Sequence, residues 1–448
     1  MLTFNGDIIK EEDTRKAIDG SFKYLLISRA LRSIALSFTT SALPLYLVFV
    51  LNLNLIGVGT TYFMIILFVA FTSFFFGILS DRIGYGKTMI IAEILPFLGF
   101  AGLVMSTFII GNKSTDLTVV IISSMLAGIS TVGGMRGAFS AGQQALIANN
   151  WKDHKDRINR VGRILTIAAI GSIIGSLLLA FQGILTGFLT VPSTSELAAS
   201  ALAFRYLFFV CVIMITLSML CLFFVKEVRM VKKRALFIKK ESSPHLLRVI
   251  SANLFSSVGI GLALPILPAL IAKSYSLHAA IASQFIGYTF GLGYVIIAIS
   301  SFYMSRLIYE REMHTLKVAS AVRVMQGIAL VLIAIIISVG GAPYGVGIGL
   351  LVLGLLYSLY SMFIGLGVPL RSAINISGIR GGDYGTASAV MGMSMQIPQT
   401  SVGLSGFISE LLPSFMASPI ALGGVFVSIG GIVYWKLLSG SKLNGKIK

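Results

Sequence analysis

Long apolar runs separated by short polar segments dominate the sequence. A helix needs about twenty apolar residues to cross the hydrocarbon core of a bilayer, and twelve runs in this chain reach roughly that length. The pattern therefore predicts an all-α integral membrane protein with twelve transmembrane helices. The predicted spans are residues 27–51, 56–79, 88–110, 117–141, 161–185, 202–225, 247–272, 279–303, 318–339, 346–368, 387–408 and 416–438.

Composition agrees with this interpretation. Only 12% of the 448 residues are charged and 56% are hydrophobic, whereas a soluble domain carries about 25% charged residues. The net charge of +18 does not indicate nucleic-acid binding, because the basic residues form short clusters between apolar runs instead of one wet, basic face. Neither a soluble enzyme nor a nucleic-acid-binding domain is expected.

The basic residues also predict the orientation in the membrane. If the N-terminus lies in the cytosol, almost all Lys and Arg residues of the connecting segments fall on the cytosolic side, and only Lys113 and Lys273 fall outside. Loops rich in Lys and Arg stay in the cytosol. Both the N- and the C-terminus are therefore predicted to be cytosolic.

The chain divides into two similar halves. A basic segment, 226–246, separates an N-terminal six-helix half, 1–225, from a C-terminal six-helix half, 247–448. A Leu-Pro pair lies near the outer end of the first span of each half, at 43–44 and 267–268, and we interpret the halves as a parallel repeat. The basic segment is expected to contact anionic lipids, with about 1 kcal/mol from each basic residue. A dedicated partner site is the alternative.

The sharpest local motif is the predicted cytosolic turn between the second and third spans. Gly77 permits close approach of a neighbouring helix, and Gly84 permits a tight turn. Asp81 is suited to accept hydrogen bonds from a helix N-terminus, while Arg82 and Lys87 hold the turn on the cytosolic side. These five residues form a candidate gate motif.

This turn resembles the signature loop of the major facilitator superfamily, Gly-x-Leu-x-Asp-Arg-x-Gly-Arg-(Arg/Lys). Two residues, Tyr85 and Gly86, depart from it by replacing basic positions before Lys87. The matching residues are Gly77, Leu79, Asp81, Arg82 and Gly84.

The resemblance implies the major facilitator fold and secondary active transport of a small solute by alternating access, coupled to an ion gradient. It implies a monomeric, multi-pass protein of the plasma membrane, without enzymatic activity, bound metal or cofactor. The expected partners are a small-molecule or ionic substrate, a coupling proton or cation, and anionic lipids.

Three alternatives stay open. A proton-coupled drug or metabolite efflux pump typically carries Arg in its fourth helix and Gly-x-x-x-Gly-Pro in its fifth. Here Ser124 stands at the Arg position, and Ser176 replaces the Pro after Gly171 and Gly175; close helix packing also explains these glycines. A membrane-embedded enzyme is not favoured, because none of the four histidines pairs at metal-ligand spacing. A channel is not favoured, because the spans lack a charged pore ring.

Charged residues within spans are costly to bury and therefore mark candidate sites. The resemblance implies that helices 1, 4, 7 and 10 line a central cavity, so Arg32 and Arg136 are candidates for binding an anionic substrate group. Snorkelling toward the headgroups is the alternative for Arg32 and the expected behaviour of Arg29. Glu93, in the third span, is expected to form a structural ion pair, with proton coupling as the alternative.

Polar residues on the implied cavity helices complete the substrate or coupling candidates. They are Asn253 in the seventh span and Tyr357 and Tyr360 in the tenth. The resemblance also implies that Asp81 contacts the free N–H groups at the start of helix 11, after residues 381–385. That contact is expected to close the cytosolic side.

Overall fold

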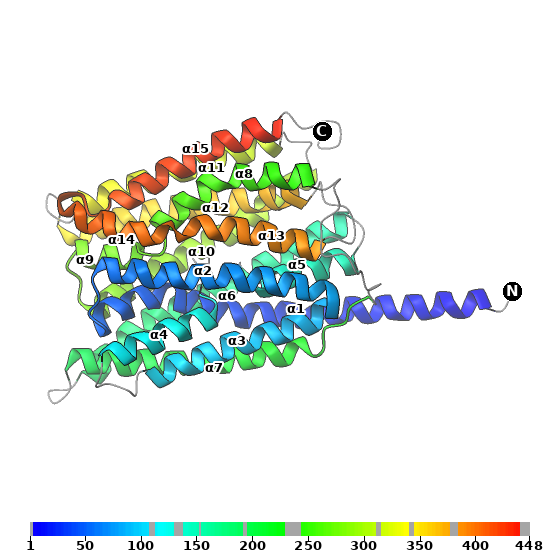
Figure 1. Cartoon of the computed structure of the whole chain (residues 1–448), viewed down its shortest axis with the longest axis horizontal. Coiled ribbons are helices and arrows are strands. Elements are labelled where there is room, and N and C mark those ends of the chain that lie inside the picture. Colours follow the sequence, from blue (N-terminus) through cyan, green and yellow to red (C-terminus); the bar gives the residue numbers. More distant parts are fainter. Residues whose placement is uncertain are drawn as a thin grey trace.

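A computed structural model describes residues 3–106, 113–129, 138–151, 154–190, 195–228, 243–310, 315–339, 345–376 and 384–439. Within these ranges every regular element is helical, and the long helices run side by side in one bundle (Figure 1). The elements are α1 (Thr3–Leu45), η1 (Tyr46–Val50), α2 (Leu55–Ile83), α3 (Tyr85–Ser106), α4 (Lys113–Ala127), α5 (Ala138–Asn150), α6 (His154–Leu189), α7 (Glu196–Leu222), α8 (Ser243–Ala263), α9 (Leu267–Ser274), α10 (Ala279–Glu310), α11 (Thr315–Val339), α12 (Val346–Ile376), α13 (Tyr384–Gln396), η2 (Ile397–Ser401), α14 (Val402–Leu411), η3 (Pro413–Phe415) and α15 (Ser418–Ser439).

Ten helical stretches of the described chain are long and apolar enough to span a membrane. They coincide with ten of the twelve predicted spans, all except the fourth and the eleventh, and the prediction of an all-α, multi-pass membrane protein is confirmed. We call the end of the bundle that holds Lys273 and Glu410 the outer end, after the predicted orientation, and the opposite end the inner end. The start of α1 and the end of α15 both lie at the inner end (Figure 1).

The predicted fourth span, 117–141, is not one continuous helix. α4 ends at Ala127, and α5 begins at Ala138 and continues to Asn150. Gly128 follows α4 with a φ of 69°, a backbone conformation that glycine adopts more readily than other residues. Hydropathy alone misses this interruption, because glycine does not break an apolar run.

The predicted eleventh span, 387–408, is continuous but irregular. It comprises α13, the 3-10 turn η2 and α14. Pro398 lies within η2 and lacks the N–H group that an α-helical hydrogen bond requires. The chain therefore tightens at this point before α14 continues to the outer end.

The first helix of each half is interrupted near its outer end. Pro44 leaves the carbonyl of Thr40 without its helical N–H partner, and the hydroxyl of Tyr62 on α2 donates to that carbonyl over 3.2 Å. After Leu45 the chain forms the π-helical turn η1. In the other half α8 ends at Ala263 and α9 begins at Leu267, on either side of Pro265.

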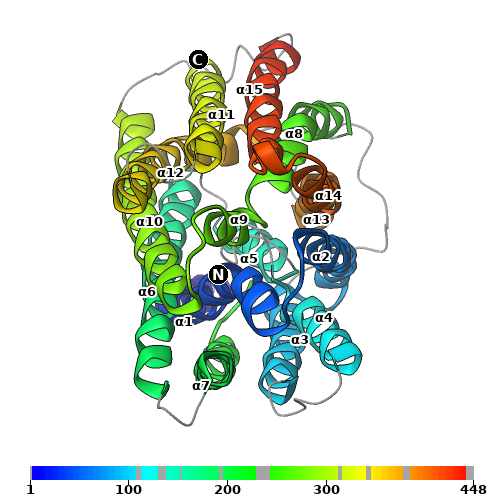
Figure 2. The ribbon, with the colours of Figure 1, turned by 90° about the vertical axis from the view of Figure 1, so that its left-hand side faces the viewer.

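The two halves meet along two sets of helices. α6 packs against α10, and α2 packs against α13 and α14. Figure 2, viewed from the outer end, shows α9 beside the end of α1 near the middle of the bundle. At the inner end, α5 also packs against α13.

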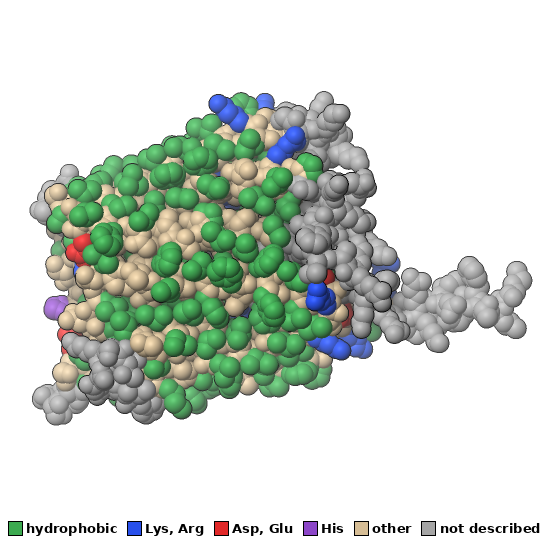
Figure 3. Space-filling view, in the orientation of Figure 1, with side chains coloured by type: hydrophobic (Ala, Val, Ile, Leu, Met, Phe, Trp, Pro, Cys, Tyr) green, Lys and Arg blue, Asp and Glu red, His purple; other side chains and the backbone are tan. Residues whose placement is uncertain are grey.

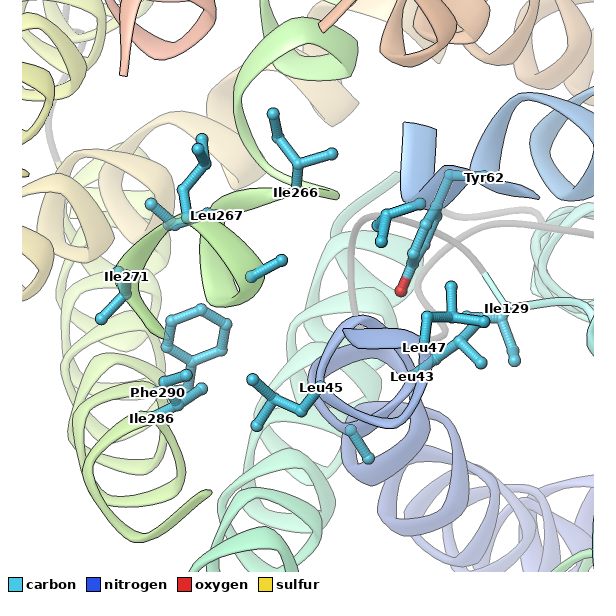
Figure 4. Packing of buried hydrophobic residues seen from close by; sticks show 14 of the residues in the cluster. Leu43, Leu45, Leu47, Tyr62, Ile129, Ile266, Leu267, Ile271, Ile286 and Phe290 are labelled. Carbon is cyan, nitrogen blue, oxygen red and sulfur yellow. The ribbon is translucent and has the colours of Figure 1, made fainter. Parts of the chain in front are cut away.

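Buried apolar residues close the outer end. The largest apolar cluster contains residues of both halves, including Leu45 of α1, Leu267 of α9 and Phe290 of α10, and Figure 4 shows Leu45 projecting toward Phe290. The two smaller clusters lie at the inner end, and each belongs to one half only. The apolar contact between the halves is therefore concentrated toward the outer end.

Large apolar side chains cover the sides of the bundle, and basic side chains gather near the inner end of the face in Figure 3. Phe75, Leu355 and Leu404, on three different helices, are each 62% exposed. Apolar patches of this extent are typical of surfaces that contact lipid or a partner. Together with the length of the helices, they identify the sides of the bundle as the lipid-facing surface.

Candidate functional site

A buried ion pair joins α1 to α3 in the N-terminal half. Nη1 of Arg32 lies 2.5 Å from Oε2 of Glu93, and the hydroxyl of Ser218 on α7 donates to Oε1 of Glu93 over 3.2 Å. The guanidinium of Arg32 also lies over the ring of Phe139 on α5, 4.8 Å from its centre. The structure thus brings two predicted site residues together. It favours the structural ion pair for Glu93 and leaves Arg32 enclosed by protein.

Arg29 is enclosed as well, so the expectation that it snorkels to the headgroups is wrong. Only 2% of it is exposed. Its Nη1 lies 3.4 Å from the hydroxyl oxygen of Ser140 on α5, and within the described chain its Nε has no hydrogen-bond partner. The expectation failed because the side chain is buried and contacts Ser140 on α5, whereas snorkelling assumes a helix surface that faces lipid.

The C-terminal half holds a related polar cluster among α8, α11 and α15. Nη1 of Arg323 donates to Oδ1 of Asn253 over 2.8 Å, and its guanidinium lies 5.5 Å from the ring centre of Tyr434. Glu93 and Arg323 stand the same number of residues after the starts of α3 and α11. In each half, an arginine therefore links the first spanning helix to the third, α1 to α3 and α8 to α11. This correspondence supports the repeat.

Two arginines inside the C-terminal half, one buried and one partly buried, were missing from the sequence-based candidates. Arg323 is only 5% exposed. Arg371, on α12, is partly buried, and within the described chain its Nη1 has no hydrogen-bond partner. The signal was present in the sequence, because an arginine inside a predicted span, or just beyond its end, already marks a candidate site.

The two predicted tyrosines of α12 belong to an aromatic cluster in the C-terminal half. The ring of Tyr357 stacks on Phe290 of α10, with centroids 4.4 Å apart, and lies 5.9 Å from the ring of Tyr360. The hydroxyl of Tyr360 accepts a hydrogen bond from Nε2 of Gln326 over 3.4 Å. Both tyrosines thus pack in the described structure, and Tyr360 is 1% exposed.

The gate motif lies between α2 and α3 at the inner end. Gly77 is buried, while Arg82 and Lys87 are exposed. Gly84 ends α2 with a φ of 104°, in the region that side chains rarely tolerate. A residue with a side chain at position 84 would strain this turn, which explains the glycine in the motif.

Asp81 and the start of α3 have partners that the sequence did not predict. The hydroxyl of Tyr85 donates to Oδ1 of Asp81 over 3.1 Å. The backbone N–H of Gly86 donates to Oε2 of Glu227, from the chain just after α7, over 2.9 Å, so a carboxylate occupies the α3 N-terminus. Residues 377–383, before α13, lie outside the described residues, and the contact of Asp81 with that helix stays a prediction.

Arg136 also lies outside the described residues, which omit 130–137. Most of the basic segment 226–246 lies outside them too, since the described chain stops at 228 and resumes at 243. The roles assigned to this arginine and to this segment therefore stay predictions.

A polar contact at the outer end links the halves. Oε1 of Glu410, at the end of α14, accepts a hydrogen bond from the backbone N–H of Leu55 at the start of α2, over 3.1 Å. It also lies 3.5 Å from Nζ of Lys273. We call these three residues the outer contact. It was not predicted, because the hydropathy pattern does not show which helix ends meet.

Glycine permits the close packing of α6 on α1. A Cβ atom at Gly171 would meet the backbone of Ala30, and one at Gly175 would meet the backbone of Ile34. The structure therefore favours helix packing as the role of these glycines.

Both the helical architecture and the signature loop are matched by a known family. The profile described as Major Facilitator Superfamily matches residues 25–402. The chain belongs to this superfamily. As a major facilitator protein it is a secondary active transporter of a small solute, and the predicted fold and function are confirmed. No curated protein matches the chain by sequence.

Solved major facilitator structures share the fold. A D-xylose-proton symporter is 15% identical with a TM-score of 0.69, over 93% of this chain and 97% of that one. The xylose transporter XylE from E. coli, in a partially occluded inward-open conformation, is 14% identical with a TM-score of 0.68, over 96% and 100% of the two chains. The human organic anion transporter MFSD10 is 14% identical with a TM-score of 0.58, over 94% and 99%. These identities establish the fold and leave the substrate open.

Proposed function

We propose that this transporter moves one small solute across the plasma membrane by alternating access, driven by an ion gradient. The observation that carries the proposal is the apolar closure of the outer end by α1 on one side and α9 and α10 on the other. Because these helices belong to different halves, the closure opens only if the halves move apart. Relative rocking of two packed halves is how parallel-repeat transporters expose their site alternately.

The contacts along α2 support rigid halves with a closable outer end. A Cβ atom at Gly59 or at Gly406 would meet the backbone of the facing helix, at Val402 and Leu55 respectively. The backbones of α2 and α14 thus touch directly, and the outer contact adds a charged group at the same place. A closure made of apolar surface and one partly exposed hydrogen bond between a backbone N–H and a carboxylate is weak enough to open during each cycle.

The proposed solute path lies between the halves. We assign substrate contact to Arg136, Tyr357 and Asn253, on three of the implied cavity helices. Arg32 and Glu93 are assigned a structural role, because both oxygens of Glu93 already accept hydrogen bonds from Arg32 and Ser218. Anionic lipids at the basic segment 226–246 complete the proposed partners.

A reconstituted transport assay tests the proposal. The purified protein is screened by thermal shift for solutes that stabilise it, since a bound solute raises stability by mass action. Uptake of the selected solute into liposomes is then measured under an imposed proton or sodium gradient, with protein-free liposomes as the control. We expect accumulation against the solute gradient that an ionophore abolishes. Conductance far above carrier turnover, or product formation without a membrane, would contradict the proposal in favour of a channel or an enzyme.

A further inference from the structure

Among the described residues, the buried charges of the inner half of the bundle do not balance. Arg29, Arg32 and Arg323 are exposed by 2%, 3% and 5%, and Glu93 is fully buried. The other buried carboxylate of the described chain, Asp116, lies in the first turn of α4 at the outer end. Toward the inner end, the described interior therefore carries more positive than negative charge.

Arg29 uses little of its hydrogen-bonding capacity within the described chain. A guanidinium has five N–H donors, whereas the described contact of Arg29 is the 3.4 Å approach to Ser140, at the long end of hydrogen-bond distances. Its Nε has no partner within the described chain. The carboxylate of Glu93 is already bonded to Arg32 and Ser218, and the described residues provide no other ion-pair partner for Arg29.

An unpaired, incompletely bonded guanidinium in a protein interior is destabilising. A carboxylate or a phosphate group would offset its charge and accept two parallel N–H bonds. A neutral polyol would accept hydrogen bonds but would leave the positive charge of the guanidinium without a counter-charge. We infer that the transported solute is an oxyanion, bearing a carboxylate or a phosphate, and that Arg29 binds its charged group beside the Arg32–Glu93 pair. This inference rests on the proposed transport function.

The local geometry fits such a site. Arg29 and Arg32 stand one helical turn apart on α1, so their side chains project from the same face, and both contact the start of α5, at Ser140 and Phe139. Ser140 adds a hydroxyl next to the guanidinium of Arg29. An oxyanion bound here would bridge α1 to α5, two elements of the same half.

A binding assay tests the inference with defined probes. The full-length protein, purified in neutral detergent, is titrated by thermal shift with inorganic phosphate, succinate and glucose at constant ionic strength. We expect saturable stabilisation by an oxyanion and none by glucose. Arg29→Gln should weaken oxyanion binding by about tenfold or more, and Arg29→Lys should weaken it less. Arg163→Gln, at an exposed position of α6, removes the same charge and should leave affinity unchanged.

The outcomes separate the source of the anion and the two proposals. If anionic lipid vesicles bind in a manner that depends on Arg29, and neither soluble oxyanion does, the site binds a lipid headgroup and the substrate inference is overturned. Saturable binding and uptake of glucose would also overturn it while the transport function stands. Oxyanion binding lost in Arg29→Gln, without flux under any gradient, would support the site and contradict transport. If Arg29→Gln does not fold, Arg29→Lys provides the comparison. Unchanged oxyanion affinity in Arg29→Lys would then count against the site. Failure of both oxyanions to stabilise the unsubstituted protein would count against it as well.

Discussion

The outer contact offers the most direct test of how the halves are held together. Glu410 belongs to the C-terminal half. It accepts a hydrogen bond from the backbone N–H of Leu55, the first residue of α2 in the N-terminal half. Asn54 already caps this helix start, since its Oδ1 accepts from the N–H of Gly57 over 2.9 Å. Glu410 therefore adds a negative charge from the opposite half to a helix N-terminus that is otherwise capped. Glu410→Gln removes the charge and keeps an oxygen that can accept the hydrogen bond.

The magnitude of the effect follows from the exposure of the two side chains. A carboxylate at a helix N-terminus contributes about 0.3–1 kcal/mol when exposed and up to about 2 kcal/mol when partly buried. The ion pair between Lys273 and Glu410, whose side chains are 31% and 37% exposed, lies within the C-terminal half and is not broken when the halves separate, so it adds little to this free-energy difference. Since 1.4 kcal/mol is a factor of ten, Glu410→Gln should shift the equilibrium toward the outward-open form by roughly twofold to thirtyfold. Lys273→Gln should have the smaller effect, because it leaves the helix contact intact.

Distances between spin labels at the outer end measure this shift. Phe188 on α6 and Ile348 on α12 are 80% and 57% exposed and belong to opposite halves, so labels there report on separation in a background without the two native cysteines. We expect a larger long-distance population in Glu410→Gln. Glu196→Gln is the matched control, because Glu196 is an exposed carboxylate at the start of α7 that makes no contact across the halves in the described chain. An unchanged distance distribution in Glu410→Gln would refute the reasoning.

Three further predictions concern the inner half of the bundle. Glu93→Gln should destabilise the protein by about 3–5 kcal/mol, because it leaves Arg32 buried without its carboxylate; chemical denaturation measures this, and the double variant Arg32→Leu/Glu93→Leu should recover much of the loss. Arg136→Ala should abolish uptake while the protein still folds, with Arg136→Lys partly active if a planar fork is needed; normal uptake in Arg136→Ala would show that this arginine only snorkels. Asp81→Asn should favour the inward-open form by about twofold to thirtyfold, and unchanged label distances at the inner end would contradict the predicted contact with the start of α13.

Hydropathy predicted most of the architecture because lipid imposes a local rule. Each span must bury its own backbone hydrogen bonds and present about twenty apolar residues to the bilayer, so the pattern of one segment reveals one helix without knowledge of its neighbours. The interruptions were less visible. Gly128 ends α4 through its backbone conformation, and Pro398 tightens the eleventh predicted span, at η2, through a missing N–H. Neither effect changes hydropathy.

The sequence by itself determined the helical membrane fold, the gate motif and the presence of costly charges inside the spans. Only the tertiary structure decided which charges meet. Arg29 was expected to reach the headgroups and is instead buried, with a contact to Ser140 on α5. Arg32 pairs with Glu93 on α3. The outer contact likewise depends on α14 ending beside the start of α2. The physical reason is that a span's composition measures its transfer into lipid, whereas pairing between charges depends on which helix faces pack together, and that information is spread over the whole chain.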